Sequence, residues 1–123
     1  MFTGIIQAVG EVAAIEQTGG DVKLRIKTGD LPLEDVHLGD SIATNGVCLT
    51  VIKQDWQGVT MLLSPETLER SSLGKLSIGA FVNVEAAMLP TTRFGGHIVS
   101  GHVDGLAKIT EIKTISDSTH LTF

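Results

Sequence analysis

Short runs in which apolar and polar residues alternate recur along the chain and predict β-strands. The clearest runs are VKLRI (22–26), VCLTVI (47–52) and FVNVE (81–85). Turn signals rich in glycine and aspartate separate these runs, among them TGGD, TGDLP, LGD, NG, WQG and IGA. Turn signals that recur every ~8–12 residues are typical of an all-β barrel or sandwich. We therefore expect an all-β fold, a small antiparallel barrel.

Two segments allow a helical interpretation. Ile6, Val9, Val12 and Ile15 recur at a spacing of about three, which a helix would also give, but Gly10 and the β-branched residues favour a strand. The segment SPETLERSSLG (64–74) predicts one short helix, because a serine can cap it, a proline suits its first position and a glycine can end it. A further helical turn is expected within LPLEDVHLGD (31–40).

The chain repeats itself near its end. When Gly101 is aligned with Gly4, no gap is needed, and the pairs that match include Thr3/Ser100, Ile6/Val103, Ile15/Ile112 and VKLRI (22–26)/THLTF (119–123). Matched apolar positions over such a length indicate an internal repeat of about one small barrel. We expect residues 1–96 to form a first barrel, with LPTTRFGG (89–96) as its linker, and residues 97–123 to begin an incomplete second repeat.

Composition excludes several classes of partner. The formal charge is −5 and the basic residues are scattered singly, which argues against binding to a nucleic-acid backbone. One Trp, four Phe and no Tyr are too few for a base-stacking platform. No apolar run approaches the ~20 residues of a membrane span. A single cysteine cannot form an internal disulfide, so we expect a cytoplasmic protein without membrane or nucleic-acid partners.

Common catalytic and metal-binding patterns are weak here. His97, His102 and Cys48 offer too few convergent ligands for zinc, so we expect no metal site. Ser100, His102 and Asp104 alternate, but neighbours on one strand face stand ~6–7 Å apart, too far for a nucleophile and its base. A polar rim of the barrel is the preferred interpretation. Neither common phosphate-binding loop is present.

Three stretches concentrate small and hydroxyl-bearing residues: FTGII (2–6), TNGVCLTV (44–51) and LLSPET (62–67). Such a set could bind a flat heterocycle through backbone edges and a polyol through hydroxyl groups. A purely structural interpretation is also open, with Leu49 and Val51 in the core and Ser64 as a helix cap. The physical pattern by itself favours the structural interpretation.

Five motifs in order, MFTGII, ATNGVCLTV, SPETLERSSLG, IGAFVNVE and GGHIVSGHVDG, resemble riboflavin synthases of the alpha-chain type over essentially the whole chain. The resemblance implies a six-stranded antiparallel Greek-key closed barrel with one short helix. Members of that family contain two such barrels and a C-terminal helix, assemble as trimers, and convert two molecules of 6,7-dimethyl-8-ribityllumazine into riboflavin and 5-amino-6-ribitylaminouracil. No metal or cofactor takes part, so we expect none.

The resemblance also implies site residues. Those that would bind substrate, lumazine or riboflavin, are Gly4, Ile5, Ile6, Cys48, Leu49, Thr50, Leu62, Leu63, Ser64, Pro65, Glu66, Thr67, Gly101, His102 and Val103. Phe2 would lie beside the reacting rings, and Cys48 and His102 would be the candidate proton carriers, with Thr50 and Ser64 as their hydrogen-bond partners.

The family's site forms between barrels of neighbouring subunits, whereas this chain stops about two strands into the second repeat. We therefore expect binding of lumazine or riboflavin with at most weak turnover. A homo-oligomer is expected, and a twofold dimer of first barrels is the simplest form for this chain. The alternatives are a non-catalytic lumazine or flavin carrier and a barrel that serves only as an interaction module.

Overall fold

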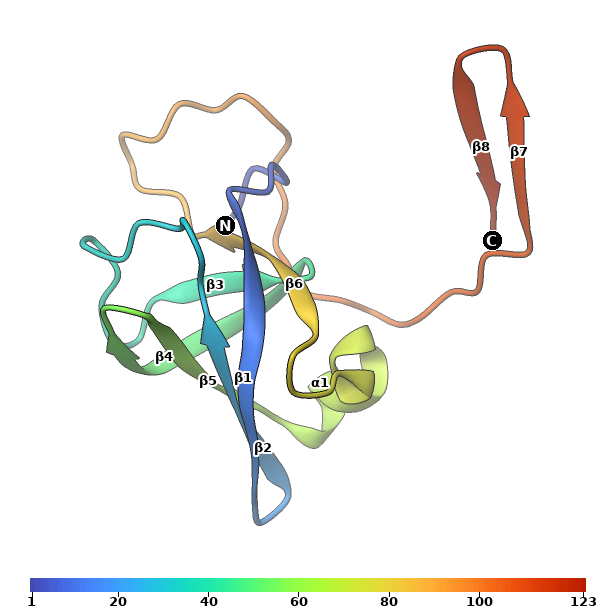
Figure 1. Ribbon diagram of the computed structural model, residues 1–123. Helices are drawn as coiled ribbons and strands as arrows, with labels where there is room; N and C mark the ends of the chain where they lie inside the picture. The colour runs from blue at the N-terminus through green and yellow to red at the C-terminus, as the bar shows by residue number, and fades with distance from the viewer.

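Six strands close into one antiparallel barrel in the computed structural model, which describes residues 1–123 (Figure 1). The order around the barrel is β1-β2-β5-β4-β3-β6, and β6 pairs back with β1. Because β3, β4 and β5 follow one another as neighbours and β6 returns to pair with β3, the connectivity is a Greek key. The strands are β1 (Ala8–Thr18), β2 (Asp21–Lys27), β3 (Ser41–Thr44), β4 (Val47–Asp55), β5 (Gly58–Leu63) and β6 (Phe81–Ala86). The expected fold class is confirmed, and so is the strand interpretation around Gly10.

The strands alternate between core and surface. Sixteen buried apolar residues form the core cluster, and they come from all six barrel strands and the segments that cover its ends. In β4, for example, Val47, Leu49 and Val51 are buried, whereas Thr50 is exposed. The period of two fixes which side chains point outward, and of the outward positions of β4 Cys48 faces the candidate site described below.

The predicted helix is divided into two short pieces, α1 (Pro65–Arg70) and the 3₁₀ helix η1 (Ser72–Lys75). Ser64 caps α1, since its hydroxyl accepts a hydrogen bond from the Thr67 N–H at 3.2 Å. Ser71 interrupts the helix in an extended conformation and caps η1. The interruption turns Leu73, which is buried, into the core. Neither helix has the length and apolar content that a membrane-spanning helix needs.

The helical turn expected within residues 31–40 is absent. The segment makes two separate turns, in which the Val36 N–H donates to the Leu33 carbonyl and the Asp40 N–H donates to the His37 carbonyl. Leu31 and Val36 are buried in the core cluster. Because these two side chains must both reach the core, the segment follows the end of the barrel and does not wind into a helix.

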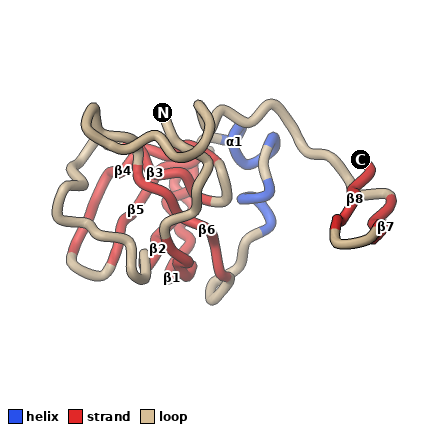
Figure 2. Tube along the Cα trace, turned by 90° about the horizontal axis from the view of Figure 1, so that it is seen from above, coloured by secondary structure: helices blue, strands red, loops and turns tan.

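The hairpin of β7 (Glu111–Ile115) and β8 (Ser118–Thr122) stands apart from the barrel, as both overall views show (Figures 1 and 2). Its register copies that of β1 and β2 at the offset that aligns Gly101 with Gly4. The pair Ile112↔Leu121 corresponds to Ile15↔Leu24, and every other pair of β7 and β8 corresponds in the same way. Both turns begin with a positive φ, 62° at Gly19 and 55° at Ser116. Residues 111–122 therefore form a hairpin with the same register as residues 14–25.

One surface ion pair predicts a dependence of stability on pH. The Arg25 guanidinium donates to the Asp55 carboxylate at 2.6 Å, and this bond, with the Gln57 N–H bond, holds the pKa of Asp55 below its ordinary value of 3.8. A carboxylate whose pKa is lower in the folded state stabilises the fold above its unfolded-state pKa, and that contribution is lost as the pH falls through the folded-state value. We therefore expect Asp55→Asn to lower the melting temperature at pH 7.

The difference between wild type and Asp55→Asn should shrink as the pH falls below 3.8, because Asp55 then becomes protonated in the wild type as well. Melting curves of both proteins between pH 7 and pH 2 measure this. A difference that stays constant over the whole range would show that charge at Asp55 does not contribute.

Candidate functional site

The N-terminal segment and the segment around residue 99 clasp each other on the outside of the barrel. Phe2 and Val99 exchange two backbone hydrogen bonds of 2.8 and 3.1 Å, and the His97 N–H donates to the Thr3 carbonyl at 2.8 Å. Phe2 is fully buried although it lies outside the core cluster. The alignment that sets Gly101 under Gly4 also sets Val99 under Phe2, so the clasp joins two aligned positions.

The clasp continues onto the edge of β4. The last pair between β4 and β5 is Thr50↔Leu62, so the backbone of Cys48 has no partner on β5. The Cys48 N–H donates instead to the Gly101 carbonyl at 2.9 Å. A Cβ atom at Gly101 would lie 2.9 Å from Cys48 Cβ and 3.1 Å from a ring carbon of Phe2. Gly101 also has a φ of +75°, which side chains rarely adopt. Only glycine therefore fits at this contact.

Gly4 and Gly101, which are aligned in the sequence, also have the same local backbone conformation. Gly4 has a φ of +80°, close to that of Gly101. The hydroxyl of Thr3 accepts from the Ile5 N–H at 3.1 Å, and the hydroxyl of Ser100 accepts from the His102 N–H at 3.2 Å. The same local turn therefore occurs around Gly4 and around Gly101. Ser100, His102 and Asp104 lie in an irregular segment and not in a strand, and the Ser100 hydroxyl binds the His102 backbone N–H and not its imidazole ring.

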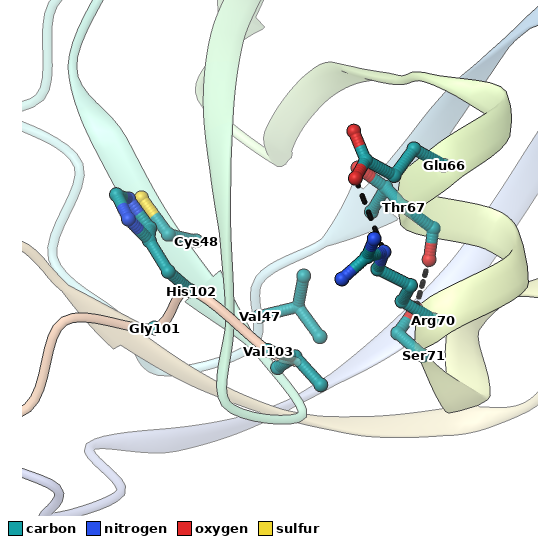
Figure 3. A pocket seen from close by; sticks show the side chains of 9 residues that line it. All are labelled: Val47, Cys48, Glu66, Thr67, Arg70, Ser71, Gly101, His102 and Val103. Carbon is teal, nitrogen blue, oxygen red and sulfur yellow. Dashed lines mark hydrogen bonds and ion pairs between the residues drawn. The ribbon is translucent and has the colours of Figure 1, made fainter. Parts of the chain in front are cut away.

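A cavity of about 360 Å³ opens where β4, α1 and the segment after Gly101 meet (Figure 3). Six of its residues were expected from the sequence: Cys48, Glu66, Thr67, Gly101, His102 and Val103. The structure thus brings together residues from three separate motifs. In Figure 3 the side chains of Cys48 and His102 lie on the β4 side, and those of Glu66 and Thr67 lie on the helix side.

Several expected residues do not line this cavity. Leu49 and Leu63 are buried in the core, so they could offer only backbone groups to a ligand. Thr50, Leu62, Ser64 and Pro65 are exposed around β4, β5 and the start of α1, and the pair Thr50↔Leu62 joins the two strands on their outer face. Gly4, Ile5 and Ile6 are exposed on the N-terminal segment.

Three residues that line the cavity were not predicted from the sequence: Val47, Arg70 and Ser71. Arg70 binds Glu66 through an ion pair of 3.1 Å, drawn as a dashed line in Figure 3, and also donates to the Asp104 carbonyl at 3.4 Å. Arg70 could have been found from the sequence, because its spacing of four residues from Glu66 places both side chains on one face of the helix. Arg70 thereby links α1 to the segment that carries His102 and Val103.

The chemistry of the cavity is that of hydrogen bonding. Its walls offer a carboxylate, a guanidinium, a threonine hydroxyl, an imidazole and a thiol, next to the apolar Val47 and Val103. No group of three or more His, Cys, Asp or Glu side chains in the structure could hold a metal ion. This combination suits a neutral ligand with an apolar ring and a hydroxyl-bearing chain.

A comparison with protein families matches residues 3–87 to the model described as "Lumazine binding domain". The chain belongs to the lumazine-binding domain family. The match spans all six strands of the barrel together with α1 and η1.

Relatives of this lumazine-binding domain include the riboflavin synthases of Photobacterium phosphoreum (54% identical over 93% of this chain), Bacillus subtilis (48% over 98%) and Schizosaccharomyces pombe (42% over 100%). The chain spans about half the length of these curated relatives, 52%, 55% and 59% respectively. The family expected from the sequence motifs is confirmed.

Solved structures of LumP show the same fold as this lumazine-binding domain. The structure of LumP complexed with 6,7-dimethyl-8-(1'-D-ribityl) lumazine superposes with a TM-score of 0.78 and covers 98% of this chain and 67% of that chain. The structure of LumP complexed with flavin mononucleotide gives 0.75, with 98% and 64% coverage. Both are 24% identical to this chain, so the likeness concerns the fold.

Proposed function

We propose that this lumazine-binding domain binds 6,7-dimethyl-8-ribityllumazine or riboflavin in the cavity between β4, α1 and residues 101–103. The observation that carries the proposal is the meeting of three motifs at one cavity on the outside of a barrel whose family is known. Residues 44–51, 62–67 and 101–103 are far apart in the sequence, yet each contributes side chains to the lining.

The two walls of the cavity suit the two parts of such a ligand. Val47 and the backbone around Cys48 form a β-strand wall against which a flat heterocycle can stack. Glu66 and Thr67 on α1 provide acceptors and donors for the hydroxyl groups of a ribityl chain. Arg70 holds the Glu66 carboxylate in place through their ion pair.

The test is a titration of 6,7-dimethyl-8-ribityllumazine or riboflavin with the protein, followed by ligand fluorescence. We expect a change that saturates in the micromolar range with one ligand per chain. Absence of any change at protein concentrations far above this range would refute the proposal.

Glu66→Ala should weaken this binding about tenfold, because a hydroxyl group of the ligand would lose its charged acceptor, which is worth ~1.5 kcal/mol. Glu69→Ala is the matched control, since Glu69 is exposed on the same helix but does not line this cavity. Titrations of both variants are compared with wild type. Equal affinities for all three proteins would show that Glu66 only pairs with Arg70.

We further propose that the chain belongs to an enzyme that converts two lumazines into riboflavin and 5-amino-6-ribitylaminouracil. Relatives named riboflavin synthase support this. Deprotonation of the lumazine C7 methyl group gives a carbon nucleophile that attacks the second ring, so the protein must hold two rings together and transfer protons. Cys48 and His102, which both line the cavity, are the candidate proton carriers, and Phe2 lies behind Gly101.

A reaction between two lumazine rings requires two binding sites. We therefore propose that part of residues 97–123 contributes to the second site. Residues 101–103 line the cavity of the first barrel, whereas the residues that follow them, as the start of a second repeat, would belong to a second site that faces a first barrel of another subunit. In the structure the side chains of Ile112, Leu121 and Phe123 are exposed, which supports a need for further partners. We therefore propose a homo-oligomer, measurable by sedimentation at several protein concentrations.

Incubation with 6,7-dimethyl-8-ribityllumazine distinguishes the possible functions. Formation of riboflavin, seen by its absorbance, supports the enzyme. Saturable binding without riboflavin formation would assign this chain a carrier role, and neither binding nor formation would leave an interaction module.

A further inference from the structure

Two neighbouring positions on the outside of the barrel are buried. Ala43 on β3 pairs with Glu85 on β6, and both alternate with inward-facing core residues such as Ile42 and Val84. Outward positions of a barrel normally face water, yet Ala43 is 4% and Glu85 is 3% exposed. The N-terminal segment binds directly to Glu85 and covers this part of the outer surface.

Glu85 uses both carboxylate oxygens to bind this segment. Oε1 accepts from the Thr3 N–H and from the Thr3 hydroxyl, both at 2.6 Å, and Oε2 accepts from the Gly4 N–H at 3.2 Å. All three donors are neutral. A buried carboxylate is costly unless its oxygens accept hydrogen bonds, so the native position of the segment and the burial of Glu85 depend on each other.

The segment held by Glu85 in turn holds one wall of the candidate site. The Thr3 carbonyl accepts from the His97 N–H, and Phe2 exchanges two hydrogen bonds with Val99. Two residues later Gly101 binds Cys48, and Gly101, His102 and Val103 line the cavity. A continuous series of hydrogen bonds therefore runs from Glu85 through residues 2–3 and 97–101 to the cavity.

We propose that Glu85 is a positioning residue for the ligand site: it fixes the N-terminal segment, and through it the wall formed by residues 101–103. The effect on affinity rests on the proposed function, whereas the effect on the clasp does not. Glu85 does not line the cavity itself, so its influence on a ligand is indirect.

Glu85→Gln is the sharpest variant because it preserves size. A glutamine has only one acceptor oxygen, so its NH₂ group would face the N–H of either Thr3 or Gly4. Both groups are donors, and that hydrogen bond would be lost. We expect amide hydrogen exchange of Phe2, Val99 and Cys48, measured without ligand, to become at least tenfold faster. Amides of Leu24 and Met61 in the barrel should keep their protection. The affinity for 6,7-dimethyl-8-ribityllumazine should fall about tenfold.

Asp55→Asn is the matched control. Asp55 also accepts two backbone N–H bonds, from Gln57 and Gly58, but it lies on the β4–β5 turn away from the clasp. In the Asp55→Asn variant the exchange rates of the clasp amides and the ligand affinity should equal those of wild type. If Glu85→Gln does not fold, Thr3→Val tests the same contact from its partly exposed side by removing one of the three donors. It should raise exchange at Phe2 and Val99 and weaken binding by a smaller factor.

The outcomes separate the two proposals. Unchanged exchange of the clasp amides in a folded Glu85 or Thr3 variant overturns the positioning role, whatever the ligand does. Faster exchange with unchanged affinity also overturns it, because the wall would then not depend on the clasp. If wild type binds no ligand while the clasp amides still respond, the anchoring by Glu85 stands, its role for a ligand is refuted, and the proposed function fails by its own test.

Discussion

Gly58→Ala is expected to destabilise the protein by about 3 kcal/mol, the upper part of the range for an added methyl group without room. A Cβ atom at Gly58 would overlap the Ile26 carbonyl oxygen and lie 2.9 Å from the Lys27 Cα. These atoms belong to the backbone of β2, so no side chain can move aside. The substitution must separate β5 from β2 where Gly58 pairs with Lys27.

Urea unfolding followed by far-UV circular dichroism measures this loss. Gly20→Ala is the control, because a Cβ at Gly20 would make only an ordinary contact of 3.6 Å with Pro65, and Gly20 has no positive φ. Its stability should stay within ~1 kcal/mol of wild type. If Gly58→Ala were as stable as Gly20→Ala, the close approach of β5 and β2 would be wrong.

Gly101→Ala is expected to weaken lumazine binding about 30-fold, equivalent to ~2 kcal/mol. The new methyl group would lie 2.9 Å from Cys48 Cβ and 3.0 Å from Cys48 N, and a φ of +75° strains any side chain. The hydrogen bond from Cys48 to Gly101 would lengthen, and His102 and Val103 would leave the cavity wall. The barrel itself should remain folded, since Gly101 lies outside the core cluster.

The control for this prediction is Gly105→Ala. A Cβ at Gly105 would meet no atom within 4 Å, and its φ is not positive. Fluorescence titrations of both variants, with circular dichroism as a check of folding, decide the matter. Gly101→Ala with wild-type affinity would mean that the ligand does not use the wall formed by residues 101–103.

The barrel strands could be predicted from the sequence because their pattern is local. In β2 and β4 the residues alternate with a period of two, which is what one buried and one exposed face require. The cap at Ser64 was equally predictable, because a cap depends on a hydrogen bond within one turn. The likeness of the two hairpins was visible in the sequence because aligned positions keep the same register, as Ile112↔Leu121 and Ile15↔Leu24 do.

Predictions from local sequence preference were wrong where the backbone conformation depends on side chains that must reach the core. The expected helix over residues 64–74 is divided at Ser71 because Leu73 must enter the core. The expected turn of helix within residues 31–40 is absent because Leu31 and Val36 are both buried at the end of the barrel. Neither demand can be read from the neighbouring residues alone.

The sequence by itself determined the fold class, the positions of β1, β2, β4 and β6, and the family, since all three depend on local patterns and on motifs. Only the tertiary structure decided which motif residues share a cavity: Cys48, Glu66 and His102 meet there, whereas Leu49 and Leu63 turn into the core. It also revealed Arg70 as part of the lining and Glu85 as the anchor of the N-terminal segment. The physical reason is that closing the barrel fixes contacts between residues some 80 positions apart, such as Thr3 and Glu85, which no local pattern encodes.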